Sequence, residues 1–190
     1  MVKKSLRKFN ALVEALQTLP TVGQKSATRL AYHMIMNDSF NAVKLAHAIE
    51  NAIGSLRKCS SCGGMSEDEL CEICSDSERD CNTLCIVENA KDIMIIEQNS
   101  YFDGRYFVLE SLDDFDMDHL RLMVSSGIDE VVFALTPSIA NDAIILYIED
   151  KLSSFNINFS KIAQGVPTGV SLENIDMLSL SRAMQDRVKV

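Results

Sequence analysis

The sequence predicts a multi-part α/β protein that combines a small helical bundle, a cysteine-rich segment and a parallel sheet with flanking helices. Hydrophobic residues recur at helical spacing through the first third of the chain, and four of the six cysteines lie within residues 59–74. From residue 83 onward, short apolar runs alternate with helical segments. Strands that alternate with helices of roughly 10–15 residues are typical of βαβ units and therefore of a parallel sheet.

Residues 1–58 are expected to form the helical bundle. Apolar side chains share one helical face over residues 6–19, and Pro20 ends that helix. A second helix is expected from about Lys25 to residue 36. A third, capped by Asp38 or Ser39, should run to about residue 57.

Residues 59–80 carry the cysteines, and residues 81–164 are expected to form the sheet. The expected strands are 83–87, 104–110, 130–135 and 157–163. The expected helices between them are 89–100, 116–127 and 138–155, and Gly127 closes the second. For the tail, residues 165–190, we expect turns, a short helix and subunit contacts.

The charge of the chain is unevenly distributed. The net charge is −9, which by itself argues against a nucleic-acid binder. However, residues 1–58 hold nine Lys and Arg against three Asp and Glu, a net charge of +6, whereas the remaining 132 residues have a net charge of −15. A basic end on an acidic body indicates that one end faces a polyanion, although helical surfaces also segregate charge by chance.

The cysteine spacing predicts a structural zinc site. Cys59, Cys62, Cys71 and Cys74 form two C-x-x-C pairs that are separated by eight residues. Each pair can place its two thiolates at two corners of a tetrahedron. The segment between the pairs then needs only to fold back so that all four thiolates surround one ion. Four protein ligands leave no position for a water, so one Zn²⁺ per chain would be structural rather than catalytic.

The other interpretations of the cysteines are weaker. Disulfides need an oxidising compartment, and nothing in the sequence indicates one. A thioredoxin-like pair should open a helix after a strand, and neither C-x-x-C pair is expected to do so. A second possible quartet combines Cys71 and Cys74 with Cys81 and Cys85. Cys85 lies inside an apolar strand, where we expect a small buried hydrophobic residue, and Cys81 is expected to be a spare.

The loop before the second helix predicts a phosphate-binding hairpin. In the segment LPTVGQKSATRLA, Gly23 precedes a helix that carries Lys25 and Arg29 one turn apart. Backbone N–H groups at a helix N-terminus bind phosphate without reading base sequence, and nearby cations strengthen the contact. A plain helical hairpin with two solvated cations is the alternative. A nucleotide-binding P-loop is excluded because its first glycine is missing.

Glu88 follows a strand at the carboxyl end, where open α/β sheets place their sites. The segment IVENAKDI resembles the Toprim domain of topoisomerases and primases, whose catalytic members hold Mg²⁺ with this glutamate and an Asp-x-Asp pair. At the matching place this chain has Thr136-Pro137-Ser138. Hydroxyl groups do not replace carboxylates on a hard cation, so we expect no Toprim catalysis.

The order of these parts resembles the RecR family of bacterial recombination mediators over essentially the whole chain. The segments that carry the resemblance are LPTVGQKSATRLA, the four cysteines, IVENAKDI, GRYFVLE and the tail GVPTGVSLENID. The resemblance implies a protein without enzymatic activity that acts in gap and break repair with the partners RecO and RecF. These proteins replace single-strand-binding protein with the RecA recombinase. The resemblance also implies dimers that assemble into a ring-like tetramer, a clamp around DNA.

The resemblance also assigns roles to single residues. Lys25 and Arg29 match the DNA contacts of the hairpin, the four cysteines match the zinc ligands, and Glu88 matches a glutamate implicated in partner binding. The sequence departs from the family where Thr21 replaces the first hairpin glycine and Gln24 replaces a proline. The stretch ALTPSIAND replaces a family signature, which puts the partner surface in doubt.

No apolar run approaches the roughly 20 residues of a membrane span, and no secretory signal is evident, so we expect a cytoplasmic protein without membrane contact. Two other functions stay open at this point. One is a Mg²⁺-dependent Toprim enzyme, and the other is a zinc-stabilised interaction module without any nucleic-acid role.

Overall fold

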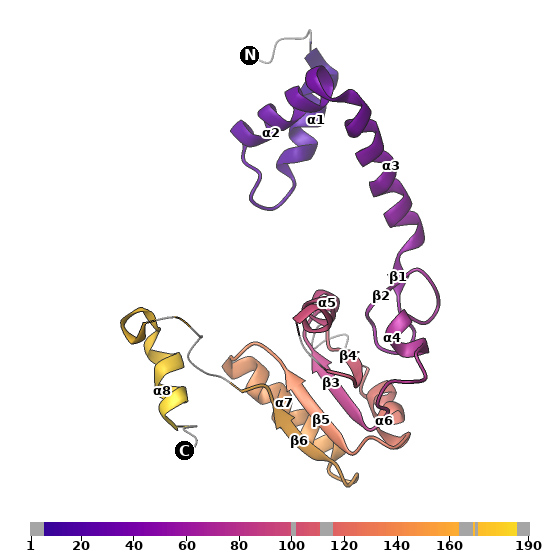
Figure 1. The fold of residues 1–190 in the computed structure, drawn as a ribbon, viewed down its shortest axis with the longest axis vertical. Helices are drawn as coiled ribbons and strands as arrows, with labels where there is room; N and C mark the ends of the chain where they lie inside the picture. The colour runs from indigo at the N-terminus through magenta and orange to yellow at the C-terminus, as the bar shows by residue number, and fades with distance from the viewer. Residues whose placement is uncertain (1–5, 100–101, 111–115, 164–168, 170, 186–190) are drawn as a thin grey trace. The chain divides into compact units, whose positions relative to one another are not determined.

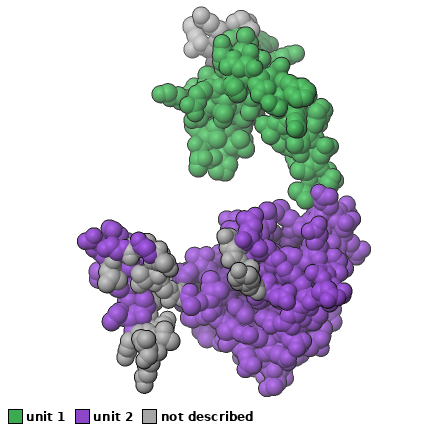
Figure 2. All heavy atoms as spheres, in the orientation of Figure 1, with its two compact units in different colours: residues 1–56 green, residues 57–190 purple. Residues whose placement is uncertain are grey.

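The computed structural model describes residues 6–99, 102–110, 116–163, 169 and 171–185 (Figure 1). The chain divides into two compact units, unit 1 with residues 1–56 and unit 2 with residues 57–190 (Figure 2). Unit 1 is helical, whereas unit 2 holds the cysteine segment and a four-stranded parallel sheet. The predicted α/β class with a separate helical bundle is therefore confirmed.

Unit 1 contains the three predicted helices. They are α1 (Arg7–Gln17), α2 (Gln24–Tyr32) and α3 (Ser39–Ser55), and α2 continues into one π-helical turn, η2 (His33–Asn37). The Asp38 carboxylate caps α3 by accepting the Asn41 N–H at 3.2 Å. The core between α1 and α2 is small, because the buried side chains described there are Val13, Ala27 and Ala31.

The third helix of unit 1 contributes nothing to this core. None of the side chains of α3 is buried, and Phe40 and Ile53 are 80% and 78% exposed. Val43, Leu45 and Ile49 on the same helix are exposed as well. An uncovered apolar helix of 17 residues is a surface that normally contacts another molecule.

The sheet of unit 2 has the strand order β4-β3-β5-β6, with every neighbouring pair parallel. The strands are β3 (Thr83–Val87), β4 (Arg105–Val108), β5 (Glu130–Ala134) and β6 (Asn158–Lys161). The connecting helices are α5 (Ala90–Asn99), α6 (Met117–Ser125) and α7 (Ile139–Leu152). The chain reverses its winding direction between β3 and β5, so this sheet has its topological switch point at the carboxyl ends of those two strands.

Side chains alternate between the two faces of the sheet and build two cores. Leu84 and Ile86 of β3 pack with α6 and α7, whereas Cys85 and Val87 pack with α5 and with the cysteine segment. The period of two along each strand explains this division. As a result, α5 and the cysteine segment share one face of the sheet.

The cysteine segment forms a knuckle, here defined as residues 57–75. It contains the antiparallel strands β1 (Arg57–Lys58) and β2 (Met65–Ser66) and the short helix α4 (Glu72–Ser75). The Val108 N–H of the edge strand β4 donates to the Cys62 carbonyl at 2.9 Å, so the knuckle covers part of that edge. The remaining elements are η3 (Leu172–Asn174) and α8 (Met177–Gln185), and no helix in the described part of the chain could cross a membrane.

Candidate metal centre and nucleic-acid interface

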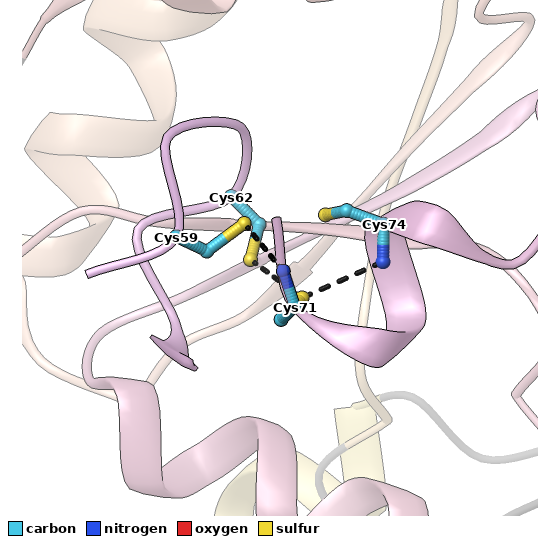
Figure 3. Close-up of side chains that lie close together, drawn as sticks. All are labelled: Cys59, Cys62, Cys71 and Cys74. Carbon is cyan, nitrogen blue, oxygen red and sulfur yellow. Dashed lines mark hydrogen bonds between the residues drawn. The ribbon is translucent and has the colours of Figure 1, made fainter. Parts of the chain in front are cut away.

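The four predicted zinc ligands converge at the centre of the knuckle (Figure 3). The sulfurs of Cys59, Cys62, Cys71 and Cys74 all lie within 4.8 Å of one another, and those of Cys62 and Cys71 are 3.6 Å apart. A tetrahedral site with Zn–S bonds of about 2.3 Å separates its sulfurs by about 3.8 Å. The spacing of these thiols therefore fits a closed, four-coordinate Zn²⁺ site.

Backbone N–H groups donate hydrogen bonds to the cysteine sulfurs and so stabilise negative charge on them. N–H groups donate from Gly64 to Cys62 Sγ and from Cys71 to Cys59 Sγ, each at 3.3 Å, and from Cys74 to Cys71 Sγ at 3.4 Å. The hydrogen bond between Cys62 and Cys74 lowers the pKa of the Cys74 thiol and raises that of the Cys62 thiol, so a bound cation is needed to hold both as thiolates. The donor set and its surroundings thus suit zinc.

The two remaining cysteines stand apart from this cluster. Cys85 is buried within β3, where burial raises the pKa of its thiol to about 12. Cys81 is exposed and lies 3.0 Å from a guanidinium nitrogen of Arg105. Among the described residues, the group that could hold a metal is the quartet of Cys59, Cys62, Cys71 and Cys74, so the alternative quartet is not formed. The buried position predicted for Cys85 is confirmed.

The hairpin between α1 and α2 presents an uncapped helix end. Gly23 is the N-cap of α2, and no side chain among the described residues accepts a hydrogen bond there. Lys25 and Arg29 are exposed on α2, one turn apart, whereas Ala27 and Ala31 are buried against α1. The exposed side of the α2 N-terminus therefore combines open N–H groups with two cations, the arrangement that the sequence predicted.

Thr21 holds a strained backbone conformation in the turn between α1 and α2. Its φ is +67°, in the left-handed region that L-residues rarely adopt. A β-branched side chain is strained there by roughly 1–2 kcal/mol relative to the right-handed region. The turn therefore adopts this conformation with a threonine, and the hairpin carries the strain. Gly23, in contrast, has φ −80° and open space around its Cα, so its conformation does not require glycine.

Glu88 lies at the switch point of the sheet and is held there by hydrogen bonds. Its Oε1 accepts the Thr136 N–H at 2.7 Å and a hydrogen bond from the side-chain amide of Asn141. The same amide donates to the Thr136 carbonyl at 2.7 Å. Ser138 caps α7 by accepting the Asn141 N–H at 3.1 Å, which fixes the start of the helix. Amide hydrogens thus satisfy the Oε1 oxygen of Glu88.

Sequence reasoning missed two of these residues. Asn141 appeared only as a departure from a signature, although it joins β3 to α7 through Glu88. The sequence pattern assigned no role to His119, whose Nε2 lies 2.7 Å from the Ser61 carbonyl of the knuckle. Its ring also packs against Phe107 with centroids 6.0 Å apart. No local spacing signals either contact, because 53 and 58 residues separate the partners.

Comparisons with known proteins agree with this geometry. The family model described as "RecR, helix-hairpin-helix" matches residues 9–53, and the model for the four-cysteine zinc finger domain of RecR matches residues 56–76. The recombination protein RecR of a Nitratiruptor species is 55% identical over 190 residues, which cover 100% of both chains. The chain belongs to the RecR family.

Other RecR relatives are similar over nearly the same length. The recombination protein RecR of Campylobacter jejuni subsp. jejuni (strain 81-176) is 52% identical over 188 residues, which cover 98% of this chain and 99% of the relative. That of Helicobacter pylori (strain Shi470) is 48% identical over 188 residues, covering 98% and 97%. Membership in the RecR family supports a role in recombination and repair.

The family match and the cysteine cluster together confirm the predicted structural zinc. The assignments of Gly23, Lys25 and Arg29 to DNA and of Glu88 to a partner stay predictions. The same holds for the predicted boundaries of the zinc and sheet regions at residues 80 and 164.

Proposed function

We propose that this RecR-family chain is a non-enzymatic mediator of recombinational repair in the cytoplasm. It binds DNA without sequence specificity through unit 1 and helps RecO and RecF to load the RecA recombinase on gaps. The observation that carries the proposal is the uncapped N-terminus of α2 beside the exposed Lys25 and Arg29. Unit 1 holds seven Lys and Arg against three Asp and Glu, so its net charge of +4 favours a polyanion.

The chemistry of this surface explains why binding would ignore sequence. Backbone N–H groups and the ammonium and guanidinium groups donate to phosphate oxygens, which are the same at every base pair. Reading base edges would require side chains that enter a groove with a fixed pattern of donors and acceptors. The α2 N-terminus offers Gly23 and Gln24 at its tip, where the backbone can approach a phosphate closely.

The surroundings of Glu88 support the absence of metal-dependent catalysis. Its Oε1 already accepts two amide hydrogens, from Thr136 and Asn141. Two-metal phosphodiester chemistry needs several carboxylates on hard cations, and Thr136, Pro137 and Ser138 offer none at the matching place. We therefore assign Glu88 a role in organising the loop after β5, and we propose that Glu88 and this loop contact a partner protein.

The exposed apolar face of α3 supports self-assembly. Phe40, Val43 and Ile53 would be covered if two copies joined through unit 1. A dimer of dimers would bring several α2 N-termini to one DNA molecule. Multivalency then raises the affinity above that of a single weak site, which suits a clamp.

The test is DNA binding measured against salt concentration for the wild type, Lys25→Ala and the matched control Lys91→Ala. Lys91 is an exposed cation on α5 of the acidic unit. We expect Lys25→Ala to weaken every DNA sequence similarly and to flatten the log–log salt slope by about 0.9, the contribution of one phosphate contact. Lys91→Ala should bind like the wild type.

Unchanged binding by Lys25→Ala would show that the hairpin assignment is wrong. A zinc-loaded oligomer without DNA affinity at low salt would favour a pure protein-interaction module. Mg²⁺-dependent turnover of nucleic acid that is lost in Glu88→Ala would favour an enzyme.

A further inference from the structure

An apolar groove lies between the knuckle and α5, on the side of the knuckle that faces this helix. Its volume is about 430 Å³, and its apolar lining includes Met65 and Ile73 from the knuckle and Ala90, Ile93 and Met94 from α5. Met65 and Met94 are 50% and 49% exposed, and Leu70 nearby in the chain is 42% exposed. The groove therefore leaves large apolar side chains on the surface of a well-packed unit.

The knuckle wall of this groove is acidic. Glu72 lines the groove, and residues 65–75 of the knuckle contain four Asp and Glu and no Lys or Arg, whereas the basic Arg57 and Lys58 of β1 are not among the lining residues. Glu97 lines the α5 wall and pairs with Arg79. Glu67, Asp68, Glu69 and Glu72 are exposed. A surface with this charge repels phosphate and attracts a cationic ligand.

The groove depends on close contact between the knuckle and α5. A Cβ added to Gly64 would lie 3.1 Å from both Cys62 Sγ and Ile93 Cδ1, so only glycine allows this approach without a shift. Ile93 in turn packs on the sheet within the second core of unit 2. Because zinc holds the knuckle together, we expect the two walls to keep their spacing in the zinc-loaded protein.

We infer that this groove docks a cationic segment of a partner protein. The segment inserts one or two large apolar side chains between Met65 and Met94, and its Lys and Arg residues face the acidic knuckle. Methionine is flexible and polarisable, so two methionines suit a surface that adapts to an inserted side chain. The volume also matches that of small ligand-binding clefts. This site goes beyond the proposed function, because it depends neither on DNA binding nor on the identity of RecO or RecF.

The experiment uses the full-length, zinc-loaded protein and two fluorescent helical peptides of equal length. Both carry Leu and Phe on one face, and the other face carries Lys and Arg in one peptide and Glu in the second. Fluorescence anisotropy measures their affinities for the wild type, Met94→Asp and the control Leu146→Asp. Leu146 is 65% exposed on α7, outside this groove.

We expect the cationic peptide to bind the wild type and the glutamate peptide to bind at least about tenfold more weakly. Met94→Asp should weaken the cationic peptide by about tenfold, because a buried apolar contact is lost, and Leu146→Asp should not. The variant adds negative charge, so attraction by charge alone would instead make it bind as well as or better than the wild type. Methyl NMR of the methionines should show shifts at Met65 and Met94, assigned with Met65→Leu and Met94→Leu.

Three results would overturn the inference. The first is equal binding of the cationic peptide to the wild type and Met94→Asp. The second is a shift of the Met65 and Met94 methyl signals by duplex DNA, which would make the groove a nucleic-acid contact. The third is a change in oligomer mass in Met94→Asp, which would show that a second copy of the chain fills the groove.

Discussion

Unit 1 and unit 2 bury their residues in opposite ways. Unit 1 packs a thin core around two alanines and leaves the large apolar residues of α3 exposed. Unit 2 fills both faces of its sheet and adds a metal centre to one of them. The helical unit therefore exposes apolar surface that can contact other molecules, whereas the sheet unit is stabilised by packed cores of its own.

The charges of the two units differ in the same way. Unit 1 has a net charge of +4 and unit 2 a net charge of −13. The charge of the first attracts phosphate, and that of the second repels it. The difference teaches that the net charge of a whole chain is a poor guide to its ligands when the units carry opposite signs.

The largest expected effect is the loss of stability in unit 2 when a zinc ligand is removed. Cys62→Ser removes a ligand and the knuckle loses its zinc, which in isolated zinc-finger peptides contributes about 10–16 kcal/mol at pH 7. We expect the knuckle to unfold and the melting temperature of the sheet to fall, because Val108 loses its partner in the knuckle. Zinc content by mass spectrometry and thermal unfolding measure this. Cys81→Ser is the control, and equal zinc loss in both variants would contradict the ligand assignment.

The next largest expected effect is a destabilisation of unit 1 that leaves unit 2 unchanged. Ala27→Leu forces a larger side chain between α1 and α2 at a position that is 0% exposed. Overpacking of this kind costs about 1–3 kcal/mol. Hydrogen exchange should accelerate over α1 and α2 and stay unchanged in the sheet. Ala11→Leu, at an exposed position of α1, should change neither, and slow exchange in α2 of the Ala27 variant would contradict the packing described.

A third change tests whether Asn141 holds Glu88. Asn141→Asp replaces a donor with a second carboxylate beside Glu88 and should destabilise unit 2 by about 1–3 kcal/mol. Because two carboxylates then face each other, millimolar Mg²⁺ should restore part of the stability. Urea unfolding with and without Mg²⁺ measures both effects, and the exposed Asn156→Asp serves as the control. Full stability of Asn141→Asp would mean that Glu88 does not depend on the amide.

The smallest effect concerns the strained turn of unit 1. Thr21→Gly relieves the left-handed conformation at φ +67°, while glycine also gains entropy in the unfolded chain. We expect a net gain of less than about 1 kcal/mol in the free energy of unfolding and no loss of DNA affinity. Gly23→Ala, which meets nothing within 4 Å, should be nearly neutral. Destabilisation by Thr21→Gly would show that the threonine side chain supports the hairpin.

The sequence predicted the parts of the molecule that local patterns determine. Helical periodicity located the helices, the cysteine spacing located the metal site, and Asp38 signalled the start of α3. The features that it did not predict join distant segments, such as Asn141 with Glu88 and His119 with Ser61. No local period encodes them, because their partners meet only after the sheet has formed. The apolar groove likewise exists only once the knuckle packs beside α5.

The most direct test of the division of roles is hydrogen exchange of the full-length protein with and without saturating duplex DNA. Slower exchange at the N-terminus of α2, with no change over the knuckle (residues 57–75) and α5 (Ala90–Asn99), is the expected result. Slower exchange over the knuckle and α5 with an unaffected α2 would contradict it, because DNA would then contact the acidic unit.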